Sequence, residues 1–363
     1  LSERLISIAP SGMTKAFFLN SGSEAIDTAI KFAWYYNNGR GLRDKKKIIS
    51  RLRGYHGVTV AGGSLTAIPL MQNDFDLPLD RMKQTDTPNF YRFGEADESE
   101  EAFSTRLANS LEQLILQEGP ETVAAFVAEP VMGAGGVILP PATYFQKIQV
   151  VLDKYDILLV ADEVICGFGR TGNMWGCNTY DIRPDMVTCA KQLSSGYLPI
   201  SAVMISEKIY DVFKEQSRKH GAFGMGYTYG GHPVSCAVAL ETLKIYEERD
   251  MIGHVQSVAP HFLERLSELS DSSIVGEARG VGLIAALELV SDKSSRAQFS
   301  PDAKAAPAIA ASALARGLVV RALPGDVIGI CPPLIIENTQ VDELFDKLAA
   351  AVTETEGLLR KAA

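Results

Sequence analysis

The sequence lacks several features that mark particular classes of protein. No apolar run approaches the roughly 20 residues that a membrane-spanning helix needs, and no charged segment followed by an apolar one opens the chain as a secretory signal would. The 5 cysteines are scattered and form no C-x-x-C pair, so neither a disulfide framework nor a zinc site is indicated. We therefore expect a cytoplasmic protein that has no metal site and no membrane partner.

Basic residues are also too few for a nucleic-acid-binding surface. The chain has 35 Lys and Arg against 44 Asp and Glu, which gives a formal net charge of −9 at pH 7, and its short basic run is confined to Lys45–Lys47. A surface of this charge repels phosphate backbones. We expect no nucleic-acid partner.

The length and composition that remain are those of a globular protein with two domains. Hydrophobic residues make up 46% of the chain and charged residues 22%. The 363 residues exceed the roughly 250–300 at which a single core stops growing. We assign residues 11–250 to a large domain and residues 251–363, together with 1–10, to a smaller one. The chain begins at Leu1 in what resembles the middle of an amphipathic helix, which leaves open whether further residues precede it in the native protein.

Apolar β-type segments alternate with helical ones through the first two thirds of the chain, a pattern that predicts a mostly parallel sheet covered by helices. We expect strands at Lys15–Leu19, Lys47–Arg51, Val123–Ala128, Ile157–Ala161, Met186–Cys189 and Ala202–Ile205. Helical periodicity predicts helices at Glu24–Tyr36, Glu101–Gln117, Ala142–Tyr155 and Pro233–Glu248. After residue 250, a helix, β-type stretches at Gly282–Leu289, Gly317–Ala322 and Val327–Cys331, and a final helix from Val341 predict a smaller α+β domain.

Two side chains of opposite charge follow neighbouring predicted strands. Asp162 ends one apolar strand and Lys191 comes just after the next, so both lie where ligands bind in open α/β sheets. A partly desolvated lysine has a free amine that can attack an aldehyde. Alone, Lys191 is more often a lysine that reaches from a strand end to water. A buried Asp162, however, needs a cationic partner, and the protonated ring nitrogen of pyridoxal phosphate would supply one.

Two further segments predict parts of the same site. Asn20–Ala25 places small residues at a helix N-terminus after a strand, an arrangement that binds phosphate, although an ordinary helix cap at Ser21 or Ser23 explains it as well. Tyr55 can offer a flat ring from the loop after strand Lys47–Arg51. His56 is as readily a hydrogen-bonded structural histidine as a functional one.

A dinucleotide-binding enzyme is the alternative that the glycine pattern raises. Gly167–Gly172 satisfies G-x-G-x-x-G after a strand. That fingerprint requires a helix directly after the glycines, whereas Asn173, Gly176, Asn178 and Pro184 favour an irregular loop here. We therefore reject this alternative.

The order and spacing of several motifs resemble the class III (omega) aminotransferases over nearly the whole chain. The motifs are Ser21-Gly22-Ser23-Glu24-Ala25, Tyr55-His56-Gly57, Glu129-Pro130-Val131, Asp162-Glu163-Val164, Gly169-Arg170-Thr171-Gly172, Lys191 and Gly226–Pro233. The resemblance implies the fold type I of pyridoxal-phosphate-dependent transferases, with a mostly parallel central sheet in the large domain and a smaller α+β domain.

The resemblance also implies roles for individual residues around pyridoxal 5'-phosphate. Gly22 and Ser23 would hold the phosphate, Tyr55 would stack on the ring, Asp162 would pair with the ring nitrogen, and Val164 would pack on the opposite ring face.

Three more residues complete the set that the resemblance implies. Lys191 would carry the cofactor as a Schiff base and move the proton during catalysis. Glu129 would order the polar groups around the ring. Thr228 would donate a hydrogen bond to the phosphate of the neighbouring subunit, so a homodimer or a higher homo-oligomer is implied.

Two details resemble the amine:pyruvate branch of the family. Ile165 stands where enzymes similar to ornithine and 4-aminobutyrate aminotransferases tend to have glutamine, and Arg321 matches a mobile arginine that binds the substrate carboxylate. We expect transfer of an amino group from an amine or omega-amino acid to pyruvate or a related 2-oxo acid by a ping-pong mechanism. Another enzyme of the same fold, such as a racemase or decarboxylase, and a catalytically silent relative are the remaining alternatives.

Overall fold

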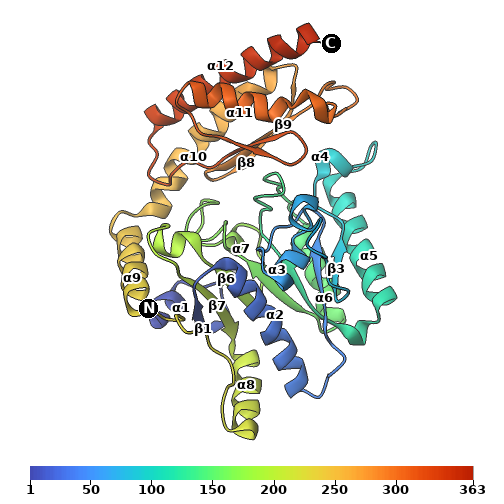
Figure 1. Ribbon diagram of the computed structural model, residues 1–363, viewed down its shortest axis with the longest axis vertical. Coiled ribbons are helices and arrows are strands. Elements are labelled where there is room, and N and C mark those ends of the chain that lie inside the picture. Colours follow the sequence, from blue (N-terminus) through green and yellow to red (C-terminus); the bar gives the residue numbers. More distant parts are fainter. Residues whose placement is uncertain (363) are drawn as a thin grey trace.

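The computed structural model describes residues 1–362, and its larger sheet occupies the centre of the large domain (Figure 1). Within that range the sheet has seven strands in the order β1-β7-β6-β5-β4-β2-β3. Their bounds are β1 Met13–Leu19, β7 Ser201–Ser206, β6 Met186–Cys189, β5 Leu158–Asp162, β4 Val123–Ala128, β2 Lys47–Arg51 and β3 Met82–Thr85. Only β7 runs antiparallel to its neighbours among these strands. The predicted mostly parallel sheet is therefore confirmed.

Helices cover both faces of this sheet, which explains the continuous apolar runs in its central strands. In β5, Leu158 and Val160 pack in the core beneath α2 (Gly22–Gly39), whereas Leu159 and Ala161 pack in the core on the opposite face. That opposite face carries α5 (Glu100–Glu118) and α6 (Tyr144–Lys154), which pack against each other. The residues after each central strand consequently lie at one edge of a rigid, two-sided core.

The other elements of the large domain are short or peripheral. Their bounds are α1 Ser2–Ser7, α3 Val60–Leu65, η1 Pro69–Met71, α4 Phe90–Phe93, η2 Pro120–Thr122, α7 Gly176–Thr179, η3 Lys191–Ser194, α8 Glu207–His220 and α9 Pro233–Glu248. Helix α1 lies against β1, and the indole nitrogen of Trp175 donates to the carbonyl of Ile8 at 2.5 Å. Residues 1–10, which we grouped with the smaller domain, thus contact the larger sheet.

The smaller domain is an antiparallel sheet covered by helices. Within the described residues its four strands have the order β10-β11-β9-β8, with bounds β8 Val275–Val281, β9 Ile284–Leu289, β10 Arg321–Leu323 and β11 Val327–Ile330. Its helices are α10 Met251–Glu268, η4 Leu269–Asp271, η5 Pro301–Ala303, α11 Ala305–Ala315 and α12 Asn338–Ala362. Figure 1 shows α11 and α12 on the side of this sheet that faces away from the larger domain.

The structure corrects the predicted strands at three points. Strand β3 was not predicted, because Met-Lys-Gln-Thr contains a single apolar residue. Strand β8 was missed because glycines and charged residues interrupt its pattern. The predicted strand at Gly317–Ala322 begins only at Arg321, since Gly317 has a φ of 75° and ends the turn after α11.

One negative finding also concerns the described residues. No helix within residues 1–362 is long and apolar enough to span a lipid bilayer.

Candidate active site

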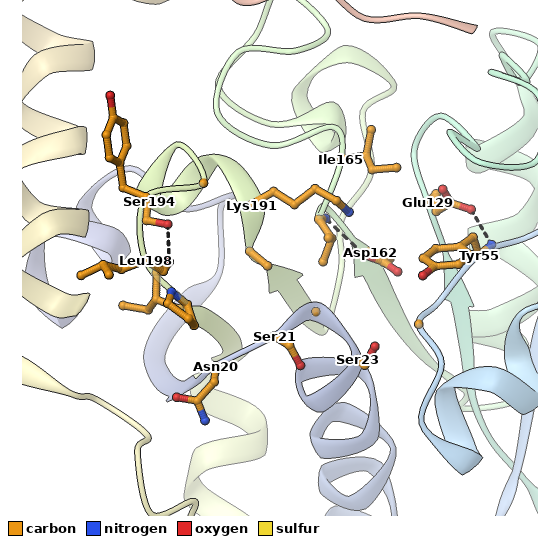
Figure 2. A pocket seen from close by; sticks show the side chains of 18 residues that line it. Asn20, Ser21, Ser23, Tyr55, Glu129, Asp162, Ile165, Lys191, Ser194 and Leu198 are labelled. Carbon is orange, nitrogen blue, oxygen red and sulfur yellow. Dashed lines mark hydrogen bonds between the residues drawn. The ribbon is translucent and has the colours of Figure 1, made fainter. Parts of the chain in front are cut away.

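A cavity of about 440 Å³ lies beside the carboxyl ends of β4, β5 and β6 and the N-terminus of α2 (Figure 2). Its walls include seven of the nine residues that the sequence analysis selected, namely Gly22, Ser23, Tyr55, Glu129, Asp162, Val164 and Lys191. They come from five separate segments of the chain. The parallel sheet brings these segments together because the carboxyl ends of its strands share one edge.

Lys191 follows β6 and begins the short helix η3. Its φ is 41°, a left-handed conformation that is uncommon for a residue with a side chain and that persists where surrounding structure enforces it. Figure 2 shows its side chain extending across the cavity toward Asp162. The backbone therefore directs this amine into the cavity.

Asp162 is the last residue of β5 and is only 3% exposed. Its Oδ1 accepts hydrogen bonds from the amide of Val164 at 3.2 Å and from the hydroxyl of Thr188 at 3.3 Å. Its Oδ2 lies 2.8 Å from Nδ1 of His56. Since a carboxylate can only accept, Nδ1 of His56 is the atom that carries the proton in this pair. These three contacts fix the orientation of the Asp162 side chain at the cavity.

His56 is the residue of this site to which the sequence assigned no role. It is 1% exposed, its amide donates to Thr66 Oγ1 at 2.7 Å, and its Nε2 has no partner among residues 1–362. Its contact with Asp162 joins positions 106 residues apart, and no spacing rule links such positions. Its place directly after Tyr55 drew attention to it in the sequence but did not decide between a structural and a functional role.

Glu129 follows β4 and is also almost fully buried. Its Oε1 accepts from the amide of Tyr55 at 3.0 Å, and its Oε2 accepts from the amide of Gly133 at 2.9 Å. Burial raises the pKa of this carboxyl above its ordinary value. Glu129 thus fixes the backbone that carries the Tyr55 ring, and the role expected for it around a bound cofactor stays a prediction.

The N-terminus of α2 provides free backbone donors toward the cavity. Ser21 is the N-cap residue and its hydroxyl accepts from the amide of Glu24 at 3.2 Å, which leaves the amides of Gly22 and Ser23 in the first turn without helical partners. A Cβ atom on Gly57 would lie 2.8 Å from Cα of Ser23, so this loop approaches the helix end closely. The segment is therefore a normal cap at Ser21 and, at the same time, an anion-binding helix terminus.

Thr228 and Arg321 do not line the cavity. Thr228 is exposed in the segment between α8 and α9, and Arg321 is exposed at the start of β10 in the smaller domain. Their expected roles, one across a subunit interface and one by a swing of the side chain, remain predictions.

The glycine segment that suggested a dinucleotide site contacts the smaller domain instead. Nη1 of Arg170 donates to the carbonyls of Leu283 at 2.8 Å and Pro332 at 2.6 Å, and the Leu283 amide donates back to Arg170. The next helix, α7, begins only at Gly176 and has four residues. Gly167–Gly172 is thus part of the contact between the domains.

Comparison with known proteins shows which family the chain resembles. The family model described as Aminotransferase class-III matches residues 1–352. Gamma aminobutyrate transaminase 3, chloroplastic, of Solanum lycopersicum is 55% identical over 344 residues, and probable gamma-aminobutyrate transaminase 2, mitochondrial, of Oryza sativa subsp. japonica is 52% identical over 357 residues. These alignments cover 95% and 98% of this chain but 66% and 72% of the two relatives. The chain therefore spans just under two thirds of the tomato protein.

Solved structures match over a larger share of their length. A structure titled "Transaminase with L-ala" is 53% identical with a TM-score of 0.96, and covers 99% of this chain and 84% of its own. The omega transaminase of Pseudomonas jessenii in complex with PMP is 50% identical with a TM-score of 0.96, over 98% of this chain and 79% of its own.

Proposed function

Because this chain belongs to the class-III aminotransferases, which use pyridoxal phosphate, we propose that it transfers an amino group from an amine or omega-amino acid to pyruvate or a related 2-oxo acid. The observation that carries the proposal is that a buried carboxylate, Asp162, and the amine of Lys191 line one cavity. The amides at the start of α2 lie at the same cavity. A lysine at a strand end usually reaches solvent alone. The presence of a buried carboxylate and free helix amides at the same cavity indicates that all three groups bind one ligand.

The residues present fit pyridoxal phosphate. The free amides of Gly22 and Ser23 suit its phosphate, the carboxylate of Asp162 suits its protonated ring nitrogen, and the amine of Lys191 suits its aldehyde. Tyr55 supplies an aromatic face and Val164 an apolar one. The phosphate, the ring nitrogen and the aldehyde of the cofactor would thus each have a suitable partner in this cavity.

Bound pyridoxal phosphate supplies an aldehyde that takes up an amino group and a ring that accepts electrons from the substrate carbon. The carboxylate of Asp162 would pair with the protonated ring nitrogen, and the contact of its Oδ2 with Nδ1 of His56 at 2.8 Å keeps that carboxylate in place. The amine of Lys191 would hold the aldehyde of the cofactor and, when free, would be placed to move a proton at the reacting carbon of the substrate. Glu129 and the α2 amides keep these groups oriented during both half-reactions.

The choice of substrates rests on the relatives and on two residues. The plant relatives are named as gamma-aminobutyrate transaminases, which favours an omega-amino acid such as γ-aminobutyrate as donor, and one neighbouring structure is titled with L-alanine, the product expected when pyruvate accepts the amino group. Ile165 gives the cavity an apolar wall. Arg321 would bind the carboxylate of the acceptor by two parallel hydrogen bonds after turning toward the cavity. Thr228 would complete the phosphate site of a second subunit in a homodimer or larger homo-oligomer.

The cytoplasmic location expected from the sequence stays a prediction. The plant relatives are named as chloroplastic or mitochondrial proteins.

The visible absorption spectrum of the purified protein, loaded with pyridoxal phosphate, tests this function. Addition of L-alanine or γ-aminobutyrate should convert the visible band of the lysine-bound cofactor into the shorter-wavelength band of its amine form, and pyruvate should restore it. A band that stays unchanged with every donor would favour a racemase or decarboxylase of the same fold. A protein that never acquires the band would be a silent relative.

A further inference from the structure

The turn at Gly133–Val137 has an unusual backbone conformation close to the cavity. Gly136 has a φ of 127° and Val137 a φ of 48°. Val137 is buried and β-branched, and the left-handed region is a genuine outlier for such a residue. Strain of this kind persists only where surrounding contacts enforce it, and it concentrates at functional sites.

Arg279, from strand β8 of the smaller domain, supplies contacts that enforce this turn. Its Nη2 donates to the carbonyl of Gly136 at 2.6 Å and its Nε donates to the carbonyl of Val137 at 2.8 Å. The guanidinium is 8% exposed, and its Nη1 bonds both Glu277 and Glu288. Because Glu288 is completely buried, Arg279 cannot turn away without leaving that carboxylate short of a partner.

The other end of the turn is joined to the cavity. The amide of Gly133 donates to Oε2 of Glu129 at 2.9 Å, and Oε1 of the same carboxylate accepts from the amide of Tyr55 at 3.0 Å. Figure 2 shows this bond between Glu129 and Tyr55 at the cavity wall. A Cβ atom on Gly133 would lie 2.5 Å from Cδ1 of Ile165, another residue of the wall. A shift of the turn would therefore move Glu129, Tyr55 and Ile165 together.

We propose that Arg279 is a positioning residue of the cofactor site: from the smaller domain it holds the strained turn Gly133–Val137, and through that turn it fixes Glu129 and Tyr55. The contact makes the geometry of the ring-binding wall depend on the docking of the two domains. The consequence for cofactor binding rests on the proposed function, whereas the effect on the turn does not.

Two variants disturb the turn from opposite sides. Arg279→Lys keeps the charge beside Glu277 and Glu288 but lacks the planar fork that reaches both carbonyls. Gly136→Ala leaves every ion pair intact and disfavours the φ of 127°, while its Cβ would lie 3.6 Å from Nη2 of Arg279, an ordinary contact distance.

Arg92→Lys is the matched control. Arg92 lies in α4, bonds the same buried Glu288 across the domain boundary, and donates to the carbonyls of Leu289 and Arg296, but it makes no bond to the turn among the described residues. The control thus weakens the same charge network without touching Gly133–Val137.

Hydrogen exchange in the protein without added cofactor is the first measurement. We expect the amides of Tyr55 and Gly133 to exchange about tenfold faster in Arg279→Lys and in Gly136→Ala, with rates close to the parent in Arg92→Lys. Equal rates in Arg279→Lys and Arg92→Lys would overturn the proposal. Should Arg279→Lys fail to fold, Gly136→Ala still decides the question.

Cofactor affinity and a rescue provide the second measurement. Pyridoxal phosphate should bind about tenfold more weakly to Arg279→Lys and Gly136→Ala than to Arg92→Lys. Val137→Gly should restore slow exchange in the Arg279→Lys background, because glycine adopts a φ of 48° without strain. If exchange stays fast in this double variant, the strained turn does not connect Arg279 to Glu129 and Tyr55. Altered exchange in a protein that shows no transamination would leave the positioning role intact and refute the proposed function alone.

Discussion

The residues selected from the sequence lie in two kinds of region, namely the cavity at the edge of the larger sheet and exposed segments outside that cavity. The edge of the larger sheet brings Lys191, Asp162 and the start of α2 into one cavity, with Asp162 buried and bonded three times. The exposed segments that hold Thr228 and Arg321 lie outside that cavity. Residues at parallel strand ends are placed by the core of a single chain, whereas residues on exposed segments need a movement or a second subunit to act.

The largest effect should come from the cavity at the edge of the larger sheet. In the proposed function, Lys191→Ala removes the amine that would hold the cofactor and move the proton, so turnover of amine donor and pyruvate should fall below detection. The melting temperature should change little, because the side chain projects into a cavity rather than into a core. Lys304→Ala is the matched control, since Lys304 also has a left-handed φ, of 48°, but lies outside this cavity. Loss of soluble protein in Lys191→Ala would show that Lys191 is needed for folding and does not serve the cavity alone.

A smaller and selective effect should come from the exposed region. Arg321→Ala should raise the KM for pyruvate about tenfold or more, because a guanidinium that pairs with a carboxylate contributes a strong, charge-assisted bond. The KM for an uncharged amine donor should stay within about twofold. Arg316→Ala serves as control, because Arg316 bonds Glu354 on the same domain and lies outside the cavity. Equal changes for both substrates would show that Arg321 does not bind the carboxylate.

The strands and the individual contacts differ in how far the sequence could predict them. The six predicted strands and the convergence of Asp162 with Lys191 follow from apolar runs and from the rule that parallel strands share a carboxyl edge. The bond of His56 to Asp162 spans 106 positions, and the bond of Arg279 to Val137 spans 142. The first contact joins two strand ends within the larger domain and the second depends on the docking of the two domains, and one sequence has no local signal for either.

The smallest effect on catalysis should come from Glu163, which follows Asp162 directly but is absent from the cavity wall. Its carboxylate accepts from the amides of Gly176 at 2.9 Å and Cys177 at 2.6 Å, and burial raises its pKa to about 7. The ordinary pKa of a glutamate side chain is 4.5, so the unfolded state releases this proton near pH 4.5 while the folded state still binds it. The stabilisation is therefore complete below pH 4.5. It is lost as the pH rises toward 7.

Thermal unfolding measured from pH 4.5 to 8 tests whether stability falls as the pH rises. The free energy of unfolding should fall by up to about 3 kcal/mol through the contribution of Glu163 as the pH rises across that window. Glu163→Gln cannot titrate, so its unfolding should lack this part of the pH dependence, while its kcat should stay within a few fold of the parent. A large loss of kcat in Glu163→Gln would mean that Glu163 takes part in catalysis. The geometry indicates instead that it stabilises the segment behind the cavity wall.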